Sequence, residues 1–87
     1  MNDQTKEIMT ILQEEAAEVI VEISKCIRFG LSEQNIERLN KELGDLGLMI
    51  DLLIDEHIGV TGSKLFEAKQ QKLKKLEIYS NIKLRKE

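Results

Sequence analysis

An apolar rhythm with a period of 3.6 residues constrains the fold of this chain more than any other feature. Between residues 7 and 29, apolar side chains recur at spacings of three and four, which aligns them along one side of a helix. These side chains are Ile8, Met9, Ile11, Leu12, Ala16, Val19, Ile20, Ile23, Cys26 and Ile27. The pattern predicts a helix over residues 4–29, and Gly30 directly after it is a typical helix stop.

Two further stretches carry the same period and predict helices over residues 33–58 and 63–80. Ser32, directly before the second stretch, and Ser63, at the start of the third, are the expected N-cap residues. The chain has no proline and only 3% aromatic residues, so its core must be aliphatic, which favours packed helices over a sheet sandwich. We therefore predict one all-α domain over residues 1–87. Its first two helices should be antiparallel neighbours, because the connection between them is short.

Length, cysteine content and charge limit the classes of function. A chain of 87 residues buries only about 60% of its unfolded surface, so help from a partner chain is expected. A single cysteine, a polar N-terminus and the absence of a long apolar run predict a cytoplasmic protein with no disulfide framework, signal peptide or membrane span. Residues 1–58 hold 5 basic and 13 acidic side chains, and residues 59–87 hold 8 basic and 3 acidic. This balance argues against nucleic-acid binding.

Two pairs of carboxylates repeat one spacing on the first two predicted helices. Glu15 and Glu18 are three residues apart, as are Glu42 and Asp45, so each pair shares a helical face. Two antiparallel helices can then surround a hard divalent ion with oxygen ligands; Mg²⁺ prefers such ligands, and Mn²⁺ would suit them too. Spacing alone also allows ordinary surface ion pairs with the nearby basic residues, which are Lys25, Arg28, Arg38 and Lys41.

The same carboxylates form a recognisable pair of motifs. Residues 14–18 read EExxE and residues 42–45 read ExxD, with 23 residues between them. Together they resemble the signature of the MazG-like all-α nucleoside triphosphate pyrophosphohydrolases, over about residues 8–80. The resemblance implies a compact single-domain hydrolase that cleaves a nucleoside triphosphate at the α–β phosphoanhydride, releasing the monophosphate and pyrophosphate. It also implies a homodimer or homotetramer, in which an antiparallel helical hairpin is completed into a four-helix-bundle-type core by oligomerisation.

The resemblance assigns roles to individual residues. It implies that Mg²⁺ is bound by four carboxylates, which are those of Glu15, Glu18, Glu42 and Asp45. Glu14 and Glu15 are the candidate catalytic residues that position or deprotonate water. Basic residues often follow ExxD in this family, which makes Lys69 and Lys72 the candidates for contact with the substrate phosphates.

The apolar pattern alone also fits a different class of protein. Apolar stripes on long helices also suit a non-enzymatic module that dimerises or binds other helices. Such a module explains Ile8, Leu12, Val19 and Cys26 but not the acids Glu15 and Glu22 at the edge of the same stripe. Stabilisation by Mg²⁺ would separate the two hypotheses.

Overall fold

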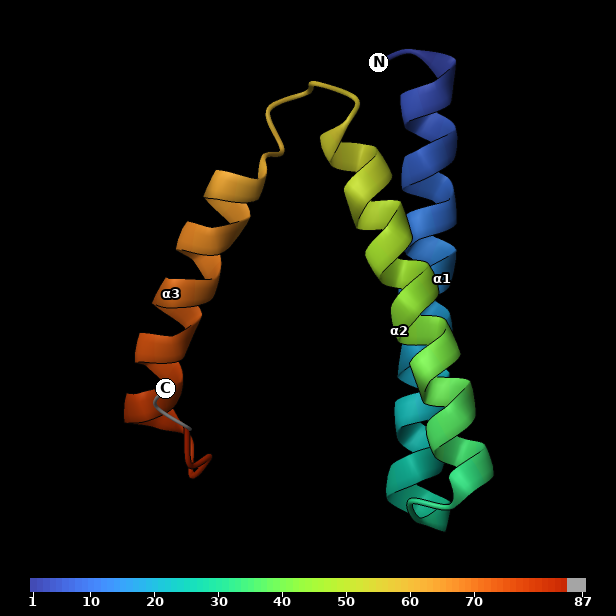
Figure 1. The fold of residues 1–87 in the computed structure, drawn as a ribbon, viewed down its shortest axis with the longest axis vertical. Helices are drawn as coiled ribbons and strands as arrows, with labels where there is room; N and C mark the ends of the chain where they lie inside the picture. The colour runs from blue at the N-terminus through green and yellow to red at the C-terminus, as the bar shows by residue number, and fades with distance from the viewer. Residues whose placement is uncertain (85–87) are drawn as a thin grey trace.

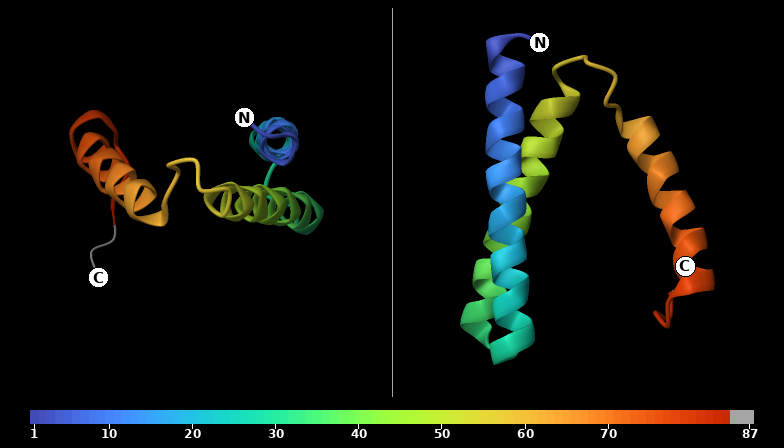
Figure 2. Two further views of the ribbon diagram at one scale, coloured as in Figure 1. Left: turned by 90° about the horizontal axis from the view of Figure 1, so that it is seen from above. Right: turned by 180° about the vertical axis from the view of Figure 1, so that it is seen from behind.

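The protein is described by a computed structural model, in which residues 1–84 are described and contain three helices and no strand. They are α1 (Asp3–Phe29), α2 (Glu33–Ile54) and α3 (Gly62–Tyr79). The helices α1 and α2 form an antiparallel hairpin, whereas α3 leaves the end of α2 and diverges from it (Figure 1). Figure 2 shows the same separation from above and from behind. The all-α prediction with three helices is confirmed.

The turn between α1 and α2 follows the predicted local signals. Gly30 has a φ of 96°, in the left-handed region that a residue with a Cβ avoids, and its N–H donates to the Cys26 carbonyl at 2.9 Å. The Ser32 hydroxyl oxygen accepts a hydrogen bond from the Asn35 N–H at 3.1 Å, which satisfies a free donor at the start of α2. Stop and start signals therefore lie within three residues, and the chain reverses there.

The end of α2 lies earlier than the sequence predicts. The helix ends at Ile54, not at residue 58, because the N–H groups of Glu56 and His57 bond to carbonyls three residues back and tighten the last turn. His57 then has a φ of 56°, so the left-handed position that ends the helix precedes Gly59. The next helix begins at Gly62 with Thr61 as its N-cap, two residues before the predicted cap Ser63.

The core is a narrow seam between α1 and α2. Its buried apolar side chains are Ile8, Val19, Cys26 and Met49, which places Cys26 in the interior as predicted. Nearly all packing between helices is between α1 and α2, and α3 has no buried residue. The described part of the chain therefore folds around one helix pair.

Many large apolar side chains lie outside this seam. On α1, Ile20 is 65% exposed and Ile27 is 80% exposed, and Phe66 on α3 is 62% exposed. No helix in residues 1–84 is both long and apolar enough to cross a membrane. The apolar stripes predicted from the sequence are thus wider than the surface that the hairpin covers.

A polar clasp closes the end of the hairpin opposite the turn. The hydroxyl of Thr5, which is buried, donates to one Glu56 carboxylate oxygen at 2.5 Å, and the Gln4 side-chain amide donates to the other at 2.8 Å. Both hydrogen bonds favour the charged carboxylate and lower the pKa of Glu56 below its ordinary value. The clasp ties the start of α1 to the residues that follow α2.

We expect the clasp to make stability depend on pH. Because the folded state lowers the pKa of Glu56, this carboxylate stabilises the fold above the ordinary pKa of 4.5, and the contribution is lost as pH falls through the lower folded value. Glu56→Gln should therefore be less stable than the wild type near neutral pH and equally stable well below the folded pKa. Urea unfolding across this range measures the difference. Asp55→Asn removes the same charge from the preceding residue, and its stability relative to the wild type should not change with pH in this way.

Candidate metal centre

Three of the four predicted metal ligands converge where α1 crosses the middle of α2. Glu15 comes from α1, and Glu42 and Asp45 come from successive turns of one side of α2. One carboxylate oxygen from each of the three lies within 4.8 Å of the others. The antiparallel hairpin thus brings the two sequence motifs together, and we refer to these three residues as the carboxylate cluster.

Glu15 has the least favourable environment in the carboxylate cluster. Its Oε2 atom is shielded from solvent and has no hydrogen-bond partner among the described residues. Desolvation raises the pKa of Glu15 above its ordinary value, and a hydrogen bond between the Glu15 and Glu42 carboxyls, together with the charges of Asp45 and Glu42, raises it further. A shielded oxygen with neighbouring negative charge is costly unless a cation approaches it.

Lys41 supplies the nearest positive charge. Its Nζ donates to the Asp45 carboxylate at 2.9 Å and lies 3.5 Å from Glu42 Oε1. The hydrogen bond to Asp45, together with the charges of Asp45 and Glu42, raises the pKa of Lys41. The lysine side chain is 68% exposed, so these are surface ion pairs of modest strength. One ammonium group cannot balance three carboxylates.

Two acidic residues of the first motif lie outside the carboxylate cluster. Glu14 and Glu18 are both exposed on α1, and Glu18 is not among the residues whose oxygens converge. The lysines predicted to contact phosphate, Lys69 and Lys72, lie on α3, where they line a shallow open hollow. No hydrogen bond or ion pair described for residues 1–84 links them to the carboxylate cluster.

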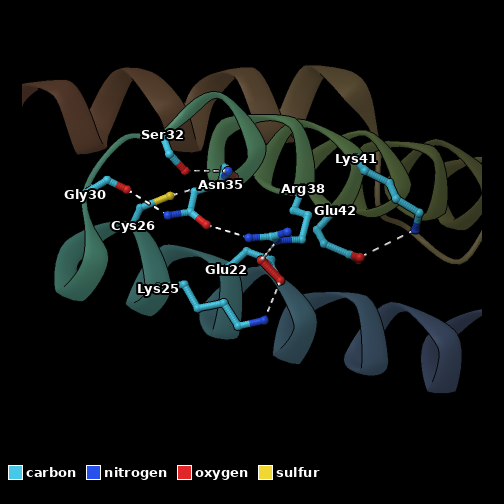
Figure 3. A network of polar contacts seen from close by, with 9 residues as sticks. All are labelled: Glu22, Lys25, Cys26, Gly30, Ser32, Asn35, Arg38, Lys41 and Glu42. Atoms are coloured by element: carbon cyan, nitrogen blue, oxygen red, sulfur yellow. Dashed lines mark hydrogen bonds and ion pairs between the residues drawn. The ribbon is translucent and has the colours of Figure 1, made fainter.

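Glu22 belongs to a separate network nearer the turn, which sequence analysis did not identify. Figure 3 shows Glu22 of α1 between Lys25 and Arg38, at 3.2 and 3.6 Å. Arg38 also donates to the Asn35 side chain at 2.6 Å, and Asn35 donates to the Gly30 carbonyl at 2.9 Å. The only local signal was the position of Glu22 at the edge of the apolar stripe.

The predicted ion pairs form in both parts of the hairpin. Near the turn they involve Glu22, and in the carboxylate cluster Lys41 pairs with Glu42 and Asp45. Glu22 is buried and has two basic neighbours. The carboxylate cluster has three acids and one exposed lysine. Glu15 Oε2 and Glu22 Oε2 are both shielded and without a hydrogen-bond partner among the described residues, but Arg38 Nε lies 3.6 Å from Glu22 Oε2, whereas no ion pair described for residues 1–84 reaches Glu15. These properties suit a hard divalent cation such as Mg²⁺, which takes one or a few carboxylate oxygens and keeps waters or phosphate oxygens as its other ligands.

Replacing Glu42 should separate the effects of charge repulsion and metal binding. Glu42→Gln keeps the side-chain shape and removes one negative charge, so without metal it should be at least as stable as the wild type. When free Mg²⁺ is about 100 times its Kd, the wild type should gain about 2.7 kcal/mol in unfolding free energy, and Glu42→Gln should gain far less. The gain for Glu18→Gln should lie between those of the wild type and Glu42→Gln, because Glu18 lies outside the carboxylate cluster.

Paired melting curves with and without Mg²⁺ measure these changes. Glu37→Gln is the matched control, since it removes the same charge from an exposed position on α2. A wild-type Mg²⁺ response in Glu42→Gln would contradict metal binding at the carboxylate cluster.

Comparisons with protein-family models, curated proteins and solved structures find no match for this chain. Its function must therefore be inferred from its own motifs and from the chemistry of the carboxylate cluster.

Proposed function

We propose that this protein is a Mg²⁺-dependent nucleoside triphosphate pyrophosphohydrolase that acts as a homo-oligomer. The observation that carries the proposal is the meeting of Glu15, from the EExxE motif, with Glu42 and Asp45, both acids of the ExxD motif. The two motifs are distant in the sequence, and only the antiparallel pairing of α1 with α2 brings them together. A solvated acidic surface does not require such convergence.

The carboxylate cluster would hold the metal, with Glu18 as a candidate fourth ligand one turn along α1 from Glu15. When bound, Mg²⁺ would neutralise phosphate charge and make the phosphorus more susceptible to attack. The shielded Oε2 of Glu15 supports this assignment, because cation binding would remove the cost of leaving that oxygen without a partner.

The remaining chemistry would fall to two acids of α1 and two lysines of α3. Glu14, exposed on α1, and Glu15 are candidates for orienting the attacking water and accepting its proton. The water oxygen forms a bond to phosphorus as the α–β anhydride bond breaks, which yields a nucleoside monophosphate and pyrophosphate. Lys69 and Lys72 are candidates for stabilising the negative charge of the outgoing pyrophosphate.

A helical interaction module is the second candidate, and the exposed apolar residues favour it. Side chains such as Ile20, Ile27 and Phe66 are more than half exposed and could bind helices of another protein. Association and hydrolysis are compatible in one oligomeric enzyme. A module alone, however, gives no reason for the convergence of three carboxylates.

Hydrolysis of nucleoside triphosphates should require both Mg²⁺ and the carboxylate cluster. We expect the wild type to release pyrophosphate and monophosphate from at least one member of a panel of canonical and modified nucleotides. Glu42→Gln should lower kcat/KM by about two orders of magnitude or more, because it removes stabilisation of the reacting phosphates. Chromatography of the products, with Glu37→Gln as control, measures this. Absence of turnover across the panel, or release of a nucleoside diphosphate and inorganic phosphate, would contradict the proposal.

The two lysines should affect substrate binding and not folding. Both side chains are exposed on α3, so Lys69→Ala and Lys72→Ala should leave the melting temperature nearly unchanged. Loss of a phosphate contact should raise KM for the nucleotide several-fold. Lys64→Ala, at the start of α3 and away from the hollow, is the matched control. Kinetics equal to the wild type in both test variants would show that these lysines are ordinary surface residues.

A further inference from the structure

The single chain is more extended and more exposed than a compact protein of its size. Its radius of gyration is 15.6 Å, whereas a compact chain of this length has one of about 12 Å. Its accessible surface is 7416 Å² for a mass of 10.0 kDa, whereas a compact monomer of that mass exposes about 5,200 Å². The excess surface comes with α3, which diverges from the hairpin (Figures 1 and 2).

One side of α3 combines apolar and basic groups. Its shallow hollow is lined by Phe66, Leu73 and Leu76 together with Lys69 and Lys72. No residue of α3 is buried, so this surface has little cover from its own chain. Any partner that covers the apolar groups must also lie beside the lysines, which favours an acidic partner.

One side of α2 has the complementary composition. Leu48 and Leu52 are 57% and 38% exposed, and their spacing from Asp45 places all three on the same side of the helix. The apolar pair therefore lies next to the carboxylate cluster. The hairpin as a whole is acidic, since residues 1–58 hold 13 acidic and 5 basic side chains.

We infer that α3 of one chain packs against the Leu48 and Leu52 surface of a second copy. In the same way, α3 of the second copy packs against the Leu48 and Leu52 surface of the first. Every chain carries both surfaces, so a twofold dimer satisfies both at once. The surface in excess of a compact monomer is about 2,200 Å² per chain, and two chains together reach the range of about 2,000–5,000 Å² typical of obligate dimers.

Charge supports a second copy as the occupant. Residues 59–87 hold 8 basic and 3 acidic side chains, opposite in sign to residues 1–58. Packing α3 on a partner hairpin brings Lys69 and Lys72 toward carboxylates, whereas hairpin packing on hairpin alone brings acids together. The inference does not depend on catalysis, because it follows from surface, charge and the separation of α3.

Chemical cross-linking of Leu48→Cys/Leu73→Cys tests this exchange. The two cysteines lie on the proposed contact surfaces, so a short bis-maleimide should give a covalent dimer at twice the 10.0 kDa chain mass. Leu48→Cys/Lys75→Cys is the matched control, because Lys75 points away from Leu73 on the helix. The control and both single variants, which retain the buried Cys26, should give several-fold less dimer.

Two results would overturn the inference. A product of single-chain mass in which one linker joins both introduced cysteines, identified by peptide mapping, would show that α3 folds back on its own α2. Equal yields in the test and control variants would show that α3 has no defined partner surface. Light scattering of the unmodified protein supplies an independent measurement, since a mass of 10.0 kDa at micromolar concentration also excludes the dimer. Circular dichroism confirms that each cysteine variant keeps its helices.

Discussion

The axial register between α1 and α2 is the constraint on which the rest of the structure depends. Each residue turns a helix by about 100°, so a slip of one residue would direct Glu42 and Asp45 away from Glu15. The register is held near the turn by Glu22, Arg38 and Asn35, and at the other end by the clasp between Thr5 and Glu56. Most of these contacts are polar, and they place the carboxylate cluster midway between two fixed ends.

Polar contacts have this role because the apolar seam is thin. Among residues 1–84, four apolar side chains are buried, and apolar packing discriminates poorly among neighbouring registers when few large side chains interlock. Glu22 is buried and would be costly without its basic neighbours. Its pairing with Arg38 of α2 therefore favours the register in which these two groups meet, and the same register brings the EExxE and ExxD acids together. Lys25 lies on the same helix as Glu22 and pairs with it in any register.

Local signals made the helices and the turn predictable, whereas contacts between distant residues did not. Gly30 and Ser32 act on their immediate neighbours, so their effects could be inferred from sequence. The end of α2 was placed too late because a residue other than glycine, His57, adopts the left-handed conformation first. The clasp between Thr5 and Glu56 could not be inferred, since it joins residues about fifty positions apart.

The candidate site was predictable to the same limited degree. Spacing identified Glu15, Glu42 and Asp45 because their helices pack in antiparallel fashion, as the short connection required. The same spacing predicted that Glu18 is a metal ligand equivalent to Glu15. A step of three residues turns the helix through about 300°, so side chains at this spacing diverge by about 60° on both helices. Glu42 and Asp45 nevertheless converge, whereas Glu18 does not join Glu15. The relation of Glu15 and Glu18 to α2 depends on where the helix axes cross, which periodicity alone does not specify.

The exposed apolar surface of α3 and the unfavourable environment of the carboxylate cluster follow from the same division of charged residues along the chain. Acids concentrate in the hairpin and lysines in α3, so neither part can neutralise its own charge. An isolated hairpin keeps Glu15 Oε2 without a partner, and an isolated α3 keeps Phe66 in solvent. Association would cover Phe66, and a divalent cation would give Glu15 Oε2 a partner. Stability and the proposed activity would then be linked, because the contacts proposed to complete the fold would also bring positive charge toward the acids proposed to bind the metal.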